Sequence, residues 1–286
     1  MNLSRRAIAE VVCASTGNHG AAVAYAARLL GVTATIFLPD HPNPVKAARI
    51  RELGARIVEA GADLSAAIDA AQDHAARAPA FLLHDASDPD VPAGAATIGL
   101  EIVEQLPAVD VIYVPMGDTA LIRGVASAAK QHRSSIRIVG VVAEQAPAYL
   151  LSWHKSRRIA VTDVVRAFRP AGVADLKVRT TSDTDVIETA TCDTIADGLA
   201  IRRPLAPNVA AIRELVDEVV AVSEQDMLDA IELLDAREQV IAEPAGAAAT
   251  AALMQQPSTA PLTVALVTGR NIAPGVRPTS SRSASG

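Results

Sequence analysis

The residues of this sequence best suited to chemistry form one short cluster, "STGNHG", at Ser15–Gly20. An apolar run precedes the cluster and an alanine-rich helical pattern follows it, so the cluster should lie at the amino end of a helix. Such an end has unpaired N–H groups and a positive dipole, and together these attract an anion. A carboxylate fits better than a phosphate, because hydroxyl and amide side chains form directed bonds to its two oxygens. The plainer interpretation, a polar cap that only starts the helix, stays open.

Two later loops have a comparable position in the sequence. "PMGDTALIRG" follows a strongly apolar stretch and precedes a helical pattern, a geometry suited to a phosphate, and "VTGRN" ends another strand-like stretch. For each of these loops a polar cap is again the alternative. Their glycine spacing matches neither the dinucleotide fingerprint nor the P-loop, and no "GxSxG" nucleophile elbow is present.

The elements that must position these loops alternate along the chain. Strand-like segments such as "TATIFLP" and "VDVIYVPMG" are separated by helical patterns such as "NPVKAARIRELG" and "ALIRGVASAAKQH". Buried strands joined by helices predict parallel sheets with helices on both faces. In such sheets ligands bind where strands end and loops lead into helices, so we expect the three loops to be the binding elements.

The composition excludes several classes of partner. The chain has 286 residues, half of them hydrophobic, and a net charge of −6 without a basic tract, which argues against nucleic acid and membrane surfaces. Two cysteines, Cys13 and Cys192, cannot form a disulfide framework or a cysteine-based zinc site. No apolar run is as long as a membrane span, and Glu10 interrupts the one stretch that resembles a signal peptide. We therefore expect a cytoplasmic protein.

Six segments occur in an order typical of one enzyme class: "ASTGNHGAAVAYAARLLG", "IRELGARIV", "VPMGDTALIRGVA", "TIADGLA", "AEPAGAAATAAL" and "VTGRN". Over about residues 10 to 273 the chain resembles the fold-type-II pyridoxal-phosphate enzymes of the tryptophan synthase β-like superfamily, above all threonine/serine dehydratase and serine racemase. The resemblance implies an α/β fold of two open, twisted, mostly parallel sheets with helices on both faces. It implies a smaller domain over 10–90 with the substrate loop and a larger domain over 91–275 with the phosphate loop; 276–286 should be a disordered tail.

The resemblance also implies an activity. The chain would be an ammonia-lyase that uses pyridoxal 5'-phosphate to eliminate the β-hydroxyl of threonine or serine, giving a 2-oxo acid and ammonia. Its partners would be the small amino-acid substrate and a second copy in a homodimer, with no nucleic acid and no membrane.

Site residues carry over position by position. Asn18 would bond the phenolic oxygen of pyridoxal, Thr268 would contact the pyridine nitrogen, and the phosphate would lie on Gly117, Asp118, Thr119 and Ala120. The substrate carboxylate would lie on Ser15, Thr16, Gly17 and His19. Thr16 stands where serine racemase-like proteins have a serine that acts on the second face of Cα. Its hydroxyl is a candidate proton relay, but its methyl group crowds the site, so elimination is expected over racemisation. The neutral hydroxyl of Thr268 also suits β-elimination.

Departures from the family pattern qualify the match. The phosphate loop, usually a run of glycines, keeps only Gly117 before "DTAL", and Asp118 brings a like charge that should point outward. Glu144 matches one ligand of the family's cation site, but Leu150 replaces the second, so no metal is predicted. We interpret His19 as a residue that orders the loop rather than as a base.

A further departure concerns the Schiff-base lysine, which is absent, since no lysine lies between Met1 and Asn18. The lysines of the sequence are Lys46, Lys130, Lys155 and Lys177, and the first two are expected to be solvated. Two explanations compete. In the first, the start was placed too late, and the larger domain therefore lacks its N-terminal elements. In the second, the chain is a shortened, non-catalytic descendant that binds an amino acid or a partner subunit. A fragment without a stable fold is a further alternative.

Overall fold

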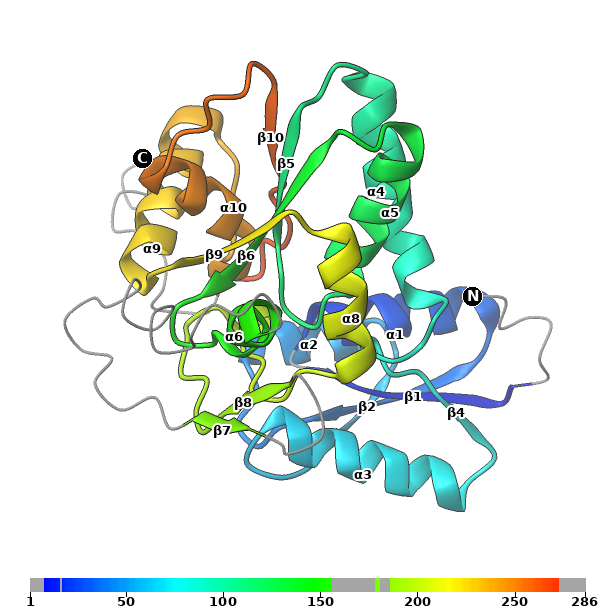
Figure 1. The fold of residues 1–286 in the computed structure, drawn as a ribbon. Coiled ribbons are helices and arrows are strands. Elements are labelled where there is room, and N and C mark those ends of the chain that lie inside the picture. The colour runs from blue at the N-terminus through cyan, green and yellow to red at the C-terminus, as the bar shows by residue number, and fades with distance from the viewer. Residues whose placement is uncertain (1–7, 16, 156–177, 181–185, 273–286) are drawn as a thin grey trace, which may run out of the picture. The chain divides into compact units, whose positions relative to one another are not determined.

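The structure is a computed structural model that describes residues 8–15, 17–155, 178–180 and 186–272 (Figure 1). The predicted tail at 276–286 and Thr16 lie outside these residues. The described chain forms two compact units. Residues up to Asp88, with Asn271 and Ile272, make the first unit, and Pro89–Arg270 make the second.

The first unit is a parallel four-stranded sheet in the order β3-β2-β1-β4. Its strands are β1 (Glu10–Ala14), β2 (Thr33–Leu38), β3 (Arg56–Glu59) and β4 (Ala80–Leu82). Its helices are α1 (Asn18–Leu30), α2 (Pro44–Glu52) and α3 (Leu64–Arg77). In Figure 1, α1 and α2 lie above the sheet and α3 lies below it. Helices cover both faces of the sheet, so the middle of the central strand β1 is buried: Val11, Val12 and Cys13 are 0% exposed.

The second unit is built on a second parallel four-stranded sheet, in the order β10-β5-β6-β9. Its strands are β5 (Val111–Pro115), β6 (Arg137–Ala143), β9 (Glu218–Val222) and β10 (Thr263–Ala265). Its α-helices are α4 (Val91–Gln105), α5 (Ala120–His132), α6 (Ala148–Lys155), α8 (Ala206–Leu215), α9 (Glu224–Leu233) and α10 (Pro244–Gln255). The 3-10 helix η2 (Asp197–Leu199), the π-helix η3 (Leu234–Glu238) and the antiparallel pair β7 (Val178–Thr180) and β8 (Ile187–Thr189) complete it. In Figure 1, α9 and α10 cover one face of the sheet and α4 and α5 the other.

Both sheets have the same strand topology. In each unit the chain passes from the first strand outward over the second and third, and the fourth strand returns to the other side of the first. The direction of winding therefore reverses beside β1 in the first unit and beside β5 in the second. Ligands of open α/β sheets bind at such reversals, outside the carboxyl ends of the strands. The predicted α/β class with parallel sheets and helices on both faces is confirmed, and each reversal lies next to one of the predicted loops.

No helix within the described residues combines the length and the apolar character needed to cross a membrane.

Candidate functional site

Ser15 follows β1 directly and is buried, with 5% of its surface exposed. Its Oγ accepts hydrogen bonds from the backbone N–H groups of Gly17 and Gly20, each at 3.0 Å. These bonds use both lone pairs of the hydroxyl and leave its hydrogen as a donor. Ser15 therefore caps α1, as the plainer interpretation of the cluster predicts, and it still has a donor for an anion. Its role in binding a carboxylate stays a prediction.

Asn18 is the first residue of α1 and is exposed. Its Oδ1 accepts a 2.8 Å hydrogen bond from Nδ2 of Asn271, which also belongs to the first unit. The other polar atom of this side chain, Nδ2, is a donor, which is what a phenolic oxygen requires. His19, next along the helix, is half-buried.

Lys46 lies against the same loop, which the sequence did not indicate. The expectation that this lysine is solvated is wrong, because Lys46 is only 6% exposed. A Cβ atom added to Gly17 would lie 2.2 Å from Cδ of Lys46, so the lysine stem packs directly on the loop backbone. Lysine stems commonly bury their methylene groups in this way. Lys130 is not solvated as expected either, since its Nζ donates to Asp217 at 2.8 Å and to the Ile136 carbonyl at 3.2 Å.

In the second unit, the loop between β5 and α5 is closely bounded by the "TIADGLA" segment. A Cβ atom at Gly117 would lie 2.1 Å from the carbonyl oxygen of Gly198 in η2. Any larger residue at position 117 would push these two backbones apart. The single glycine that remains in this loop is therefore the one that the close approach requires.

Asp118 is half-buried, and its carboxylate bonds the start of the next helix. Its Oδ1 accepts a hydrogen bond of 2.9 Å from the backbone N–H of Ala120, the first residue of α5. A carboxylate at a helix N-terminus is favoured by the helix dipole, and aspartate commonly bonds the N–H group two residues ahead. In the structure this N–H group, which was predicted to contact phosphate, therefore binds Asp118.

Thr119 is the residue of this loop that best fits a phosphate. It is 1% exposed, and its φ of 80° is unusual for a β-branched residue. Among the described residues no group forms a hydrogen bond with its Oγ1. A buried hydroxyl without a hydrogen-bond partner lowers the stability of the fold by about 1–3 kcal/mol, and a positive φ at a residue other than glycine lowers it by a similar amount. Both costs occur at the amino end of α5, where an anion is favoured, so this position fits the phosphate of the implied cofactor.

Thr268 is exposed and lies beside the amino end of α10. Its N–H donates to the Gly246 carbonyl at 3.4 Å, and the Glu243 N–H donates to the Gly269 carbonyl at 2.8 Å. A Cβ at Gly246 would lie 2.6 Å from that same Gly269 oxygen. The "AEPAGAAATAAL" and "VTGRN" segments therefore pack backbone against backbone.

Ala245 links these contacts to η2, because a Cβ at Gly198 would lie 3.1 Å from Cβ of Ala245. Four of the six segments that carry the resemblance thus meet at one place in the second unit, beside the reversal at β5. Gly198 and Gly246 were not among the predicted site residues. The small residues of "TIADGLA" and "AEPAGAA" were the signal that could have indicated them.

Glu144 follows β6 in the second unit. Burial raises the pKa of its carboxyl group, and the nearby charges of Asp226 and Glu224 raise it further. Leu150, which replaces the second cation ligand, is 1% exposed and belongs to the hydrophobic core. Across the part of the chain that the structure describes, no three His, Cys, Asp or Glu side chains are grouped so as to hold a metal ion.

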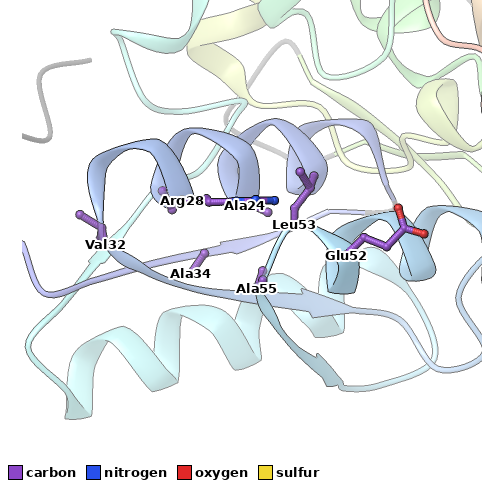
Figure 2. A pocket seen from close by; sticks show the side chains of 9 residues that line it. Ala24, Arg28, Val32, Ala34, Glu52, Leu53 and Ala55 are labelled. Carbon is purple, nitrogen blue, oxygen red and sulfur yellow. The ribbon is translucent and has the colours of Figure 1, made fainter.

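A cavity of about 350 Å³ lies elsewhere in the first unit, between the C-terminal ends of α1 and α2 (Figure 2). Ala24, Ala34 and Leu53 form part of its lining, together with Arg28 and Glu52. Arg28 is ten residues along α1 from Asn18, about 15 Å along the helix axis. The cavity also adjoins the amino ends of the strands, opposite to the edge where such sheets bind ligands. It is not part of the predicted site.

The chain matches the family described as "Pyridoxal-phosphate dependent enzyme" over residues 1–269. The L-threonine ammonia-lyase of Geobacter sulfurreducens is 35% identical over 271 residues, which cover 94% of this chain and 60% of that protein. The L-threonine ammonia-lyase of Thermotoga maritima is 35% identical over 263 residues, 92% of this chain and 59% of that protein. The chain thus spans about three fifths of the length of these relatives.

Solved structures give the same result. A threonine deaminase superposes with a TM-score of 0.76 at 29% identity, covering 93% of this chain and 79% of that chain. Maize serine racemase superposes with a TM-score of 0.78 at 28% identity, covering 95% of this chain and 76% of that chain. The resemblance seen in the six segments is confirmed, and the chain belongs to the family of pyridoxal-phosphate dependent enzymes.

Proposed function

We propose that this protein is a pyridoxal-phosphate dependent ammonia-lyase that acts on a small hydroxy-amino acid, threonine or serine. The observation that carries the proposal is the buried Thr119 hydroxyl, for which the described residues supply no partner, at the amino end of α5. The two L-threonine ammonia-lyases at 35% identity support the choice of reaction.

In this proposal each loop has one task. Gly117–Ala120 would hold the phosphate, with the Thr119 hydroxyl as donor, and Thr268 would meet the pyridine nitrogen with a neutral hydroxyl. Asn18 would donate to the phenolic oxygen through Nδ2, since its Oδ1 is held by Asn271. When bound, the cofactor supplies an electron sink for the carbanion left by removal of the α-proton.

The substrate would lie at the amino end of α1. Ser15 would donate its remaining hydrogen to the carboxylate, with Thr16, Gly17 and His19 around it, and Thr16 is the candidate to move a proton at Cα. Loss of the β-hydroxyl as water and later uptake of one water give a 2-oxo acid and ammonia as net products. The cytoplasmic location and the homodimer are also part of this proposal.

The test is direct. The purified full chain is incubated with pyridoxal 5'-phosphate and L-threonine, and the 2-oxo acid and ammonia are measured separately. We expect equal amounts of both from threonine or serine and none from alanine, which has no β-hydroxyl to lose. Release of neither product from threonine or serine, by a chain that binds the cofactor, would contradict the lyase and favour the non-catalytic alternative.

A further inference from the structure

Two buried polar side chains lie behind the phosphate loop of the second unit. Tyr149 on α6 and Asn208 on α8 are each 2% exposed. Tyr149 belongs to the hydrophobic core, together with aliphatic residues such as Ile122 and Val209. Polar groups in such a place are costly unless they form hydrogen bonds, so the bonds that they make indicate why they are there.

Both side chains converge on one atom, the carbonyl oxygen of Asp118. Asn208 donates to it through Nδ2 at 3.2 Å, and Tyr149 donates through its hydroxyl at 3.5 Å. The Tyr149 hydroxyl in turn accepts from Asn208 Nδ2 at 3.4 Å and from the Leu205 N–H at 3.3 Å. Two helices distant in sequence thus hold a single peptide group of the loop.

The state of the phenol suits this arrangement. Burial raises the pKa of Tyr149, and the nearby Asp118 charge raises it further, against the lowering effect of its bonds with Asn208 and Leu205. The hydroxyl therefore stays protonated at neutral pH and remains a donor to the carbonyl.

The orientation of that peptide group decides where the next N–H points. The described chain contains no cis peptide bond, so the Asp118 C=O and the Thr119 N–H lie on opposite sides of one planar trans group. Because the carbonyl points toward Asn208 and Tyr149, the Thr119 N–H points away from them. The positive φ of Thr119 then turns the chain into α5 immediately after this group.

We propose that Asn208 and Tyr149 are positioning residues for phosphate recognition: by fixing the Asp118 carbonyl they aim the Thr119 N–H at the phosphate. This inference rests on the proposed function, because it concerns the same cofactor site. It goes further by naming residues that do not touch the ligand and yet set its affinity. An apolar pair of similar shape would fill the core as well, but it would leave the peptide group free to rotate.

The test compares Tyr149→Phe and Asn208→Leu, which remove the donors and keep the approximate volume. The matched control is Ser152→Ala on the same helix. Ser152 is 0% exposed, and its hydroxyl bonds the Ala148 carbonyl and the Ile187 N–H, not the loop. The ligands are pyridoxal 5'-phosphate, inorganic phosphate and pyridoxal, which lacks the phosphate. Binding is followed by fluorescence of Trp153, the single tryptophan, and by phosphorus NMR.

We expect each variant to weaken binding of pyridoxal 5'-phosphate and of inorganic phosphate about fivefold to tenfold, the effect of one or two neutral hydrogen bonds. Binding of pyridoxal should change less than about twofold, as expected for a ligand that makes no contact with the loop. Ser152→Ala should lower the melting temperature without this selectivity. If Asn208→Leu does not fold, Tyr149→Phe alone decides the question.

Three results would overturn the inference. The first is an equal loss for pyridoxal and pyridoxal 5'-phosphate, which would indicate a merely structural role. The second is unchanged binding in both variants, which would leave the proposed function intact. The third is the same selective loss in Ser152→Ala. A wild-type chain that binds none of the three ligands would overturn both the inference and the proposed function.

Discussion

Nδ2 of Asn271 donates a 2.8 Å hydrogen bond to Oδ1 of Asn18, joining two residues that are 253 positions apart in sequence. Both residues belong to the first unit, although the chain between Pro89 and Arg270 forms the second. The bond fixes which end of the Asn18 amide is engaged. It therefore prepares a donor at the place where the family resemblance puts the phenolic oxygen of the cofactor.

A double-mutant cycle tests this relationship. We expect Asn18→Ala and Asn271→Ala each to weaken binding of pyridoxal about fivefold, the effect of one neutral hydrogen bond. The double variant should be little worse than either single one, because both remove the same oriented donor. Binding of inorganic phosphate to the second unit should not change. Full additivity of the two losses would show that Asn271 does not act through Asn18.

The glycines at the phosphate loop give a second prediction. We expect Gly117→Ala and Gly246→Ala each to lower the free energy of unfolding by about 1–3 kcal/mol, since a Cβ would press on a neighbouring backbone. Gly94→Ala in α4 is the control, because a Cβ there meets nothing within 4 Å, and alanine should stabilise this helix by about 0.5–1 kcal/mol. Urea unfolding followed by Trp153 fluorescence measures all three. Equal stability of Gly117→Ala and Gly94→Ala would contradict the close packing.

The sequence predicted the α/β fold well because its signals were local. The apolar strands, the helical patterns and the polar loops between them all follow from neighbouring residues, and parallel pairing follows from the helical connections. It could not give the strand orders β3-β2-β1-β4 and β10-β5-β6-β9, because pairing depends on residues far apart. Those orders place the loops after β1 and β5 beside the reversals, and so they explain why polar clusters occur there.

The residues that the sequence missed make contacts that no local pattern indicates. Lys46 belongs to an otherwise ordinary helix, and only the packing of α2 against the first loop buries its stem. Tyr149 and Asn208 belong to no local motif in the sequence, and their common target, the Asp118 carbonyl, becomes visible only in three dimensions. For Asp118 the sequence indicated only the charge, and the bond that its carboxylate accepts from the N–H group of Ala120 needed the structure.

The pH dependence of stability gives a third prediction, from Glu10 at the start of β1. Burial raises the pKa of its carboxyl group, but hydrogen bonds from Thr35 and His74 and the charges of His74 and Arg56 outweigh this and hold the pKa below its ordinary value of 4.5. Thr35 donates at 2.6 Å, and Nε2 of His74 lies 3.3 Å from the carboxylate. A carboxyl group with a lowered pKa stabilises the fold at pH values above its ordinary pKa. This contribution is lost as the pH falls through the pKa that the group has in the folded state.

Glu10→Gln should therefore be less stable than wild type at pH 6, and the difference should shrink as the pH falls below 4.5. Glu52→Gln is the control, since Glu52 also forms an ion pair, with Arg49 at 3.2 Å, but its side chain is 65% exposed. It should change stability by less than about 0.5 kcal/mol at any pH. Hydrogen exchange of the β1 amides reports the stability of the first unit. A difference for Glu10→Gln that stayed constant down to about pH 3 would refute the assignment.

The contact between Gly17 and Lys46 gives the last prediction. Gly17 has a φ of 165° and a ψ of −79°, and a Cβ added to it would lie 2.2 Å from Cδ of Lys46, so the lysine stem opposes alanine at this position. We expect Gly17→Ala to destabilise the first unit by about 1–3 kcal/mol in the wild-type background. In a Lys46→Ala background the stem is gone, so the same substitution should cost less than about 0.5 kcal/mol. Hydrogen exchange of the β1 and α1 amides measures the four members of the cycle. If Gly17→Ala is equally costly in both backgrounds, Lys46 is not what keeps position 17 a glycine, and the loop must be shaped by its own backbone.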